Sequence, residues 1–331
     1  MMDEIETITI STNTENTDNT TTNIINKRNL LVIINPKSGT GKSLQYYYDN
    51  KHIILQSYNI TLFISRFHEH VYDYFKNNNK EISKINNILT FGGDGILHQV
   101  INCLIKYNLD IPVSQYPSGS GNGFFKSICY ENNKIDTKYE SLLMLEKNKI
   151  ELMDLMLINK NLYSFLAISW GFISDLDINT EWMRNIGSIR FDIGAVWNII
   201  RKRSYRGTLT YFTTTLDNTE TQISISDNFI YFWACNTSHA SSTTFSSPKS
   251  KKDDGWIYIS YILNNISRYE LMKIMLSLST GKFINNPNVH YIKTKKFKLV
   301  TKSGIITIDG ERANLNTIDV SIIPKKIKVL V

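Results

Sequence analysis

Runs of aliphatic residues followed by helical patterns make up the first half of the chain. Such runs are typical of strands that are buried on both faces of a parallel sheet. They occur at residues 30–34, 60–65, 88–91 and 111–116. After the third run, apolar residues recur at i, i+3, i+4 and i+7 from Leu97 to Leu104, which predicts a helix with one apolar face. Strands that alternate with helices predict an α/β domain over residues 27–148.

The pattern changes at about Lys149, where short alternating or apolar segments begin, separated by turn residues. These segments predict an antiparallel β-sandwich over residues 149–331, interrupted by helical stretches at 177–200 and 268–278. The predicted fold class is therefore α/β plus β, with an N-terminal parallel-sheet domain and a C-terminal sandwich. Residues 1–26 include a Ser-, Thr- and Asn-rich stretch with little to bury, and we expect a disordered polar leader there.

Composition and charge narrow the class of protein. The 331 residues are 42% hydrophobic and 20% charged, which is ordinary for a globular protein. The net charge of +7 is spread over several lysine and arginine runs, and it suits anionic membranes or nucleotide phosphates. Nucleic acid is a weaker interpretation, because no basic stripe is interleaved with aromatic residues. Three scattered cysteines suggest neither a disulfide framework nor a zinc site.

The ends of the chain and its apolar runs bear on localisation. We find no signal-peptide pattern and no apolar run long enough to span a bilayer. The expectation is a cytoplasmic protein that associates transiently with membranes and needs no obligate protein partner.

A glycine-rich turn with one carboxylate joins the third strand to the helix after it. Gly92, Gly93 and Gly95 surround Asp94 in this turn. Glycine lets the backbone approach a ligand closely, and a helix N-terminus offers free N–H groups to an anion. Asp94 could be a base that takes a proton from an attacking hydroxyl, or it could be a helix N-cap. The turn alone leaves both interpretations open.

Two more glycine turns, at residues 35–43 and 117–123, also follow predicted strands. The first is not a P-loop, because position 36 is proline where that motif needs glycine. It is not a dinucleotide fingerprint either, since Leu44 stands where the last glycine belongs. Three such turns at the carboxyl ends of parallel strands predict a nucleotide site.

Two charged groups in the second half have plain explanations when taken alone. Asp177, Glu181 and Arg184 share one face of a predicted helix, and this spacing also fits a solvated salt-bridge face. The segment Asp309-Gly310-Glu311 follows a predicted strand, where a surface hairpin turn explains it equally well.

Five segments together resemble the conserved blocks of lipid kinases and, more narrowly, of sphingosine kinases with the diacylglycerol-kinase-like catalytic fold. In order, they are Asn35-Pro36-x-x-Gly39-x-Gly41-Lys42, Gly92-Gly93-Asp94-Gly95-x-x-His98-x-Val100-x-Asn102, Pro117-x-Gly119-Ser120-Gly121-Asn122, Trp170-Gly-Phe-x-x-Asp175-x-Asp177 and Asp309-Gly310-Glu311. The first three also fit diacylglycerol or ceramide kinases, whereas the fourth, extended to Arg190, is specific to sphingosine kinases. The chain departs from the family pattern at four positions, which are Ser65, Gln99, Gly123 and Phe124.

The resemblance implies an ATP-dependent sphingosine kinase that phosphorylates the primary hydroxyl of a sphingoid base. ATP would bind between the two domains, with the lipid pocket in the sandwich. Asp94 matches the catalytic base, Gly93 and Gly95 lie beside it at the substrate, and Asp177 matches the carboxylate that holds the head group. The matching ATP-binding positions are Asn35, Pro36, Lys37, Ser65, Gly92, Gly119, Ser120, Gly121, Arg184, Arg190, Asp309, Gly310 and Glu311. Mg²⁺ is expected to be held mainly by the ATP phosphates.

Two other functions remain open. A diacylglycerol or ceramide kinase would use the same machinery. A non-catalytic lipid- or nucleotide-binding module is less favoured, because Asp94 and both arginines are retained.

Overall fold

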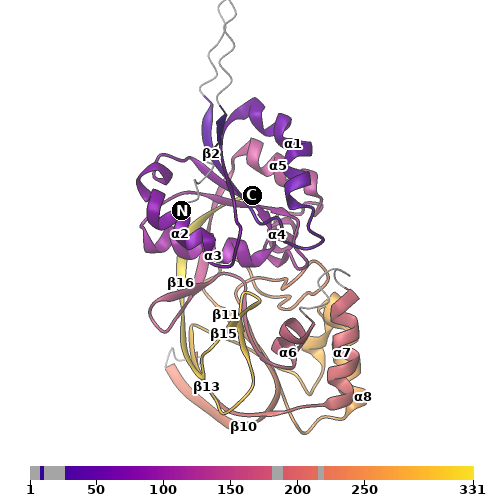
Figure 1. The fold of residues 1–331 in the computed structure, drawn as a ribbon. Coiled ribbons are helices and arrows are strands. Elements are labelled where there is room, and N and C mark those ends of the chain that lie inside the picture. Colours follow the sequence, from indigo (N-terminus) through magenta and orange to yellow (C-terminus); the bar gives the residue numbers. More distant parts are fainter. Residues whose placement is uncertain (1–7, 11–26, 181–188, 215–219) are drawn as a thin grey trace, which may run out of the picture.

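The computed structural model describes residues 8–10, 27–180, 189–214 and 220–331. These residues form an α/β half, from β1 to α5, and a β half, from β6 to β16, stacked on one another (Figure 1). Inside the predicted leader, the alternating segment Ile8–Ile10 forms strand β1, which pairs antiparallel with β3. The other residues of the leader lie outside the described part of the chain.

A mainly parallel sheet with helices packed against it forms the α/β half. Its strands, in addition to β1, are β2 (Arg28–Ile34), β3 (Tyr58–Ile64), β4 (Asn87–Gly92) and β5 (Val113–Pro117). Its helices are α1 (Ser43–Ser57), α2 (His70–Ile82), α3 (Asp94–Lys106), α4 (Gly123–Glu131) and α5 (Lys138–Lys147). The sheet order β3-β2-β4-β5 places β2, β4 and β5 side by side. The three glycine turns follow these neighbouring strands, so they meet at one edge of the sheet.

The aliphatic runs form strands because both faces of the sheet are covered. All five residues from Leu30 to Ile34 are fully buried. Leu31 and Ile33 belong to one hydrophobic cluster, whereas Leu30, Val32 and Ile34 belong to another. This alternation follows from the two-residue period of a strand, and it explains why no polar residue interrupts the run.

The β half is antiparallel, as the short alternating segments predict. Its strands are β6 (Ile150–Ile158), β7 (Leu162–Ser164), β8 (Ala167–Gly171), β9 (Tyr205–Thr214), β10 (Glu220–Cys235), β11 (Ile257–Leu263), β12 (His290–Thr294), β13 (Lys296–Thr301), β14 (Ile306–Ile308), β15 (Glu311–Ala313) and β16 (Thr317–Leu330). Its helices are α6 (Phe172–Asn179), α7 (Ile189–Arg201), α8 (Arg268–Leu276) and the short 3₁₀ segments η2 (Leu278–Thr280) and η3 (Lys282–Asn285).

The predicted helix over 268–278 is confirmed as α8, and Ser267 caps it by accepting a hydrogen bond from Glu270 N at 3.1 Å. The single helix predicted over 177–200 is wrong at its start. Helix α6 begins at Phe172, directly after a strand, and ends at Asn179, whereas α7 begins at Ile189. Residues 181–188 lie outside the described part.

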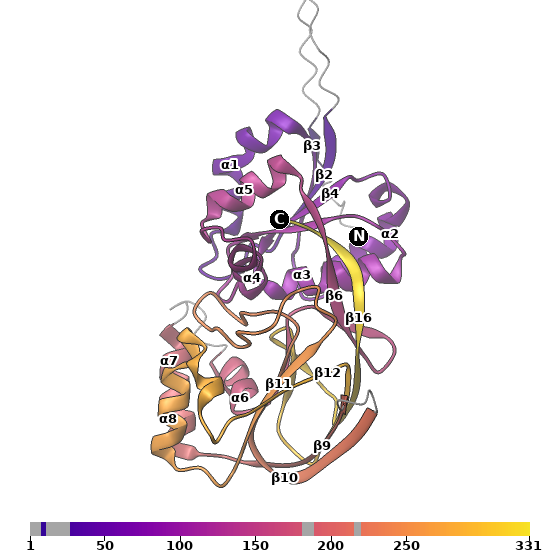
Figure 2. The same ribbon diagram turned by 180° about the vertical axis from the view of Figure 1, so that it is seen from behind.

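Two long strands join the halves. Strands β6 and β16 pair with each other and run from the β half into the α/β half, where Val329 of β16 pairs in parallel with Val113 of β5 (Figure 2). One hydrophobic cluster also crosses the boundary, and Phe124 packs edge-on against Phe165 in it at 5.6 Å between ring centroids. The site between the halves is therefore built on a shared sheet and core.

Cys103, Cys129 and Cys235 are free and buried. Among the helices of the described segments, none combines the length and apolar character needed to cross a bilayer.

Candidate active site

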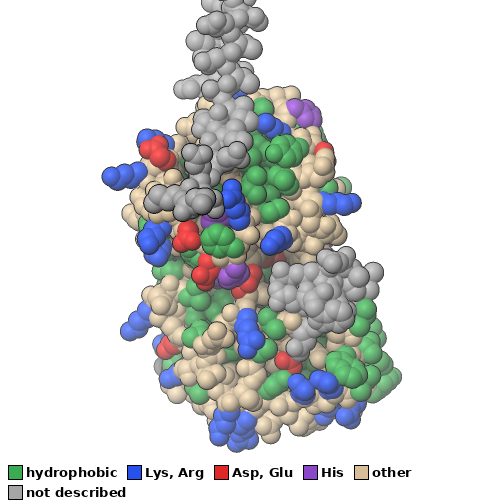
Figure 3. Space-filling model, viewed as in Figure 1, with side chains coloured by type: hydrophobic (Ala, Val, Ile, Leu, Met, Phe, Trp, Pro, Cys, Tyr) green, Lys and Arg blue, Asp and Glu red, His purple; other side chains and the backbone are tan. Residues whose placement is uncertain are grey.

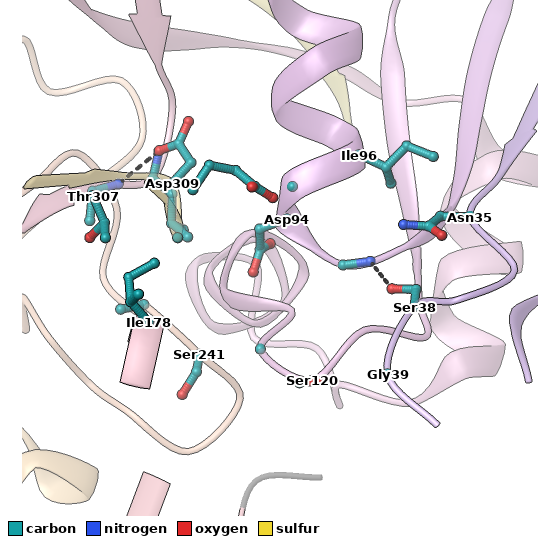
Figure 4. Close-up of a pocket in the computed structure, with 18 of the residues that line it drawn as sticks. Asn35, Ser38, Gly39, Asp94, Ile96, Ser120, Ile178, Ser241, Thr307 and Asp309 are labelled. Carbon is teal, nitrogen blue, oxygen red and sulfur yellow. Dashed lines mark hydrogen bonds between the residues drawn. The ribbon is translucent and has the colours of Figure 1, made fainter. Parts of the chain in front are cut away.

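A cavity of about 400 Å³ lies between the two halves. Figure 4 shows Asp94 inside it, with Asn35, Ser38 and Gly39 of the first glycine turn on one side. Thr307, Asp309 and Ile178 of the β half lie on the other side. The wall is polar near the turns and largely apolar toward the β half, where Leu166, Ile173, Leu176, Ile178, Trp233 and Leu278 line it. The cavity thus joins a polar compartment to an apolar one, and Asp94 stands between them.

The glycine turns pack on one another through bare backbone. Gly93 N donates a hydrogen bond of 2.9 Å to Ser38 Oγ, which ties the second turn to the first. A Cβ atom at Gly119 would overlap the backbone of Gly93, so the third turn can approach the second only without a side chain. Asn122 then closes the third turn, since its side chain bonds both Gly119 N and Gly119 O at 2.9 Å.

Asp94 is the first residue of α3, but its side chain does not cap that helix. The N-cap residue of α3 is Gly93, and no side chain makes a cap hydrogen bond there. The interpretation of Asp94 as the helix N-cap is therefore wrong. The carboxylate instead accepts hydrogen bonds from Gly123 N at 2.9 Å and Phe124 N at 3.2 Å, the first two amides of α4. Gln115 Nε2 lies 3.4 Å from Oδ1.

This environment sets the proton affinity of Asp94. The residue is 8% exposed. Burial raises the pKa of its carboxyl from 3.8 to about 6, while the amides of Gly123 and Phe124 pull that pKa downward and nearby Asp309 raises it. The amides oppose the rise because they stabilise the ionised form. A carboxyl with this pKa is ionised at neutral pH and can still accept a proton readily, as a general base requires.

The two unusual residues after Asn122 have structural reasons. Gly123 supplies one of the amides that bind Asp94, and a Cβ atom there would lie 2.6 Å from the carbonyl oxygen of Ala240. The segment around Ala240 belongs to the β half and closes over the third turn, with Ser242 N donating to Gly121 O at 2.7 Å. Phe124 is buried in the shared core.

Asp309 is buried and makes contacts within the protein. Its carboxylate accepts hydrogen bonds from Ser164 Oγ at 2.6 Å and from three consecutive backbone amides, which are Phe165 N, Leu166 N and Ala167 N. It also contacts His98 Nδ1 at 2.7 Å. Asp309 therefore fastens α3 to the start of β8. Glu311 is partly exposed, lies over Gly95 and faces His68 at 3.5 Å.

His98 and Asn102 are positioning residues to which the sequence analysis assigned no role. The Asn102 side chain donates to Tyr163 O and accepts from Tyr163 N, both at 2.9 Å. These bonds tie α3 to β7. The available signal was the i, i+4 spacing, which places both residues on one face of a helix. Gln115 was missed as well, although a polar residue inside an apolar strand run could have indicated it.

Residues 29–156 match the diacylglycerol kinase catalytic domain family, and residues 177–331 match the YegS C-terminal NAD kinase beta sandwich-like domain. This chain has a diacylglycerol kinase catalytic domain. Sphingosine kinase 1 of Homo sapiens is 25% identical over 329 residues and covers 85% of each chain. Sphingosine kinase 2 of Arabidopsis thaliana is 26% identical over 337 residues, covering 86% of this chain and 69% of the relative.

Solved structures agree on the fold of this kinase. A diacylglycerol kinase from Bacillus anthracis superposes with a TM-score of 0.65 at 14% identity, covering 92% of this chain and 96% of the other. The α/β half with its parallel sheet contains most of the segment that matches the diacylglycerol kinase catalytic domain family, and the β half contains the sandwich-like domain that follows it.

Most of the site positions suggested by the sequence line the cavity between the two halves. They are Asn35, Lys37, Ser65, Gly93, Asp94, Gly95, Ser120, Gly121, Asp309, Gly310 and Glu311. Pro36, Gly92 and Gly119 belong to the same turns but do not form the lining. Arg184 lies outside the described residues. Asp177 and Arg190 lie on α6 and α7, but their side chains are not described.

The cavity between the halves offers few ligands for a metal ion. Over the described segments, no group of three or more His, Cys, Asp or Glu side chains is arranged to hold one. Of the described carboxylates in the cavity wall, Asp309 is occupied by five donors, Asp94 accepts from two backbone amides, and Glu311 faces His68. This donor set fits an ion held mainly by nucleotide phosphates, with at most one or two protein carboxylates.

Proposed function

We propose that this chain is an ATP-dependent sphingoid-base kinase. The primary hydroxyl of the lipid attacks the γ-phosphorus of ATP, the bond from that phosphorus to the bridging oxygen breaks, and ADP leaves. The hydroxyl proton passes to Asp94. The products are a sphingoid-base 1-phosphate and ADP.

The observation that carries this proposal is the position and chemistry of Asp94. It stands between three glycine turns and a compartment lined by aliphatic side chains (Figure 4). Phosphoryl transfer depends mainly on positioning and on neutralising phosphate charge, with little covalent work for the protein. The turns supply the amides, Lys37 adds a cation at the first turn, and Asp94 supplies the base. Mg²⁺ bound to the phosphates would neutralise further charge.

The choice of a sphingoid base rests on the relatives and on Asp177. Both relatives described above are sphingosine kinases. Asp177 lies on α6 between Leu176 and Ile178, which line the apolar compartment. A carboxylate there would pair with the ammonium of a sphingoid base, for which neither diacylglycerol nor ceramide has an equivalent. We assign Arg184 and Arg190 to the nucleotide phosphates.

The test is ATP consumption by the purified chain against sphingosine, diacylglycerol and ceramide in mixed micelles. The proposal predicts turnover with sphingosine that exceeds both neutral lipids by at least about tenfold, the effect expected for one charge-assisted hydrogen bond. Turnover mainly with a neutral lipid would replace the proposal with a diacylglycerol or ceramide kinase. ATP or lipid binding without turnover would indicate a non-catalytic module.

We also propose that the enzyme binds anionic membranes transiently through α7 and α8. Ile193, Val196, Trp197 and Ile200 follow i, i+3, i+4 and i+7 spacing on α7, and all are at least 50% exposed. Tyr269, Met272 and Leu276 are exposed on α8, which packs against α7. Figure 3 shows apolar side chains gathered over the region of α7 and α8 at the edge of the β half, with cations beside them. An exposed apolar face of this kind marks a binding surface.

Cations rim this α7–α8 surface. The guanidinium of Arg201 lies 4.5 Å from the Trp197 ring, and Lys273 Nζ lies 4.3 Å from the Tyr269 ring. An apolar face with a basic rim suits an anionic bilayer. A Trp197→Ser, Ile200→Ser variant should lose most sedimentation with phosphatidylserine vesicles. The matched control is Ile135→Ser, which removes a 76% exposed aliphatic side chain from the α/β half. Equal vesicle binding by both variants would contradict the membrane surface.

A further inference from the structure

Three hydroxyl side chains from separate elements meet beside the cavity. Ser169 of β8 and Thr307 of β14 stand directly opposite each other in the strand register, with their oxygens 2.6 Å apart. Ser174 of α6 completes the group, at 2.9 Å from Ser169 Oγ and 3.2 Å from Thr307 Oγ1. All three residues are buried, and Ser169 and Thr307 line the cavity. We call Ser169, Ser174 and Thr307 the hydroxyl cluster.

The hydroxyl cluster has spare capacity to accept hydrogen bonds. Each hydroxyl offers one hydrogen and two lone pairs. Three mutual contacts can use all three hydrogens in a ring, which leaves one lone pair on each oxygen. A ligand group that donates a hydrogen bond can therefore be added without breaking the ring, whereas a group that only accepts requires one internal bond to be broken.

The hydroxyl cluster lies in a mainly apolar part of the cavity wall. Its neighbours along the cavity wall are mainly apolar, and they include Leu166, Ala167, Ile173 and Trp233. Burying polar groups in such a wall costs free energy unless they are hydrogen-bonded, and aliphatic side chains would have filled the same space. The cluster thus places hydroxyl groups among the apolar side chains of the lipid compartment.

The hydroxyl cluster is held in a fixed place relative to Asp94. Asp309 lies two residues after Thr307, and both residues line the cavity. Asp309 in turn contacts His98, one turn along the helix that begins at Asp94. Figure 4 shows Thr307 across the cavity from the glycine turns, with Asp94 between them.

We propose that the hydroxyl cluster accepts a hydrogen bond from a second hydroxyl group of the lipid, close to the hydroxyl that is phosphorylated. This inference rests on the proposed function and assigns residues to the hydroxyl that a sphingoid base carries next to its amine-bearing carbon. Diacylglycerol offers no such donor, because its ester oxygens only accept. The cluster thereby adds to the discrimination between the two lipids.

The test compares two amino alcohols that differ by one group. Sphinganine carries the second hydroxyl, and 2-amino-octadecan-1-ol lacks it. We expect the wild type to prefer sphinganine in kcat/KM by about 3- to 10-fold, the effect of one neutral hydrogen bond. Thr307→Val keeps the side-chain shape and leaves the Ser169–Ser174 bond in place, and it should reduce this preference to about 1. Ser169→Ala should act in the same direction and provides a second variant if Thr307→Val unfolds.

The matched control is Thr208→Val. Thr208 makes a similar hydroxyl pair with Ser226 at 2.7 Å, but on an exposed part of the sheet. This variant should keep the wild-type preference. An unchanged preference in both Thr307→Val and Ser169→Ala would overturn the assignment of the cluster, as would equal use of the two amino alcohols by the wild type. Neither result would affect the proposed kinase activity. A wild type that phosphorylates diacylglycerol and neither amino alcohol would instead overturn the proposed function together with this inference.

Discussion

Replacing Asp94 with Asn should remove most turnover while leaving the fold nearly as stable as before. A positioned general base is worth about 100- to 10,000-fold in rate. Asn has nearly the same shape but cannot take the proton. ATP binding should change little, because the glycine turns and their amides remain in place.

The stability of this variant follows from two opposing effects. The raised pKa of Asp94, about 6 against 3.8, means that its charge destabilises the fold at pH 7 by roughly 3 kcal/mol. Asn relieves that cost. However, one of the amides of Gly123 and Phe124 then faces the Asn NH₂ group and loses its acceptor, which costs about 1–3 kcal/mol. The two effects nearly cancel at neutral pH.

The effect of the Asp94 charge on the free energy of unfolding depends on pH. A carboxyl whose pKa is raised in the folded state contributes stability that is fully present below 3.8 and is lost as the pH rises through about 6. At pH 4 the wild type is already protonated, so Asn relieves nothing and only the lost acceptor remains. The variant should therefore melt close to the wild type at pH 7 and below it at pH 4.

Three measurements check these expectations. They are sphingosine turnover, ATP binding by calorimetry, and kcat/KM from pH 5 to 8. The wild type should lose about tenfold in kcat/KM for each pH unit below 6. A phosphate group also titrates near pH 6, so the inflection belongs to Asp94 only if the Asn variant lacks it. A variant that keeps more than about a tenth of wild-type turnover would refute the role of Asp94 as a base.

Three further variants test other parts of the account. Gly119→Ala should reduce the free energy of ATP binding more than it reduces the free energy of unfolding, because the added methyl group overlaps the Gly93 backbone. An unchanged ATP affinity would show that the two turns can separate freely. Asp309→Asn should lower the free energy of unfolding by about 1–3 kcal/mol in urea titrations, because buried donors lose their acceptor. The control Glu311→Gln changes a partly exposed carboxylate and should alter the free energy of unfolding little. The Arg184→Ala, Arg190→Ala variant should raise the KM for ATP, with only partial rescue by Lys; normal ATP kinetics would place both arginines on a solvated helix face.

The parts of this protein that follow local patterns were predictable from sequence. Four aliphatic runs correspond to β2 to β5, because strands covered on both faces need continuous apolar residues. The glycine turns converge because they follow β2, β4 and β5, which are neighbours in a parallel sheet. The same reasoning placed Asp94 beside them.

Contacts between residues far apart in sequence could not be predicted in this way. Asp309 contacts His98 across 211 positions of the sequence, and the local pattern around neither residue predicts this contact. The segment around Ala240 reaches the third glycine turn from the other half of the chain. The hydroxyl cluster likewise joins three elements. The hairpin turn predicted at Asp309 is present, because β14 pairs with β15 across it. The local pattern did not predict that the Asp309 side chain is buried and joins the two halves.

The measurement that tests the central claim most directly is catalytic efficiency on sphingosine and on diacylglycerol, for the wild type and for Asp177→Asn. A carboxylate paired with the sphingoid ammonium contributes a charge-assisted hydrogen bond, so its removal should lower efficiency on sphingosine by about 10- to 150-fold. Efficiency on diacylglycerol should change little, because that lipid has no ammonium to pair. The account predicts a wild type that prefers sphingosine and a variant in which the gap narrows. A wild type that prefers diacylglycerol, or a variant with an unchanged ratio, would contradict it.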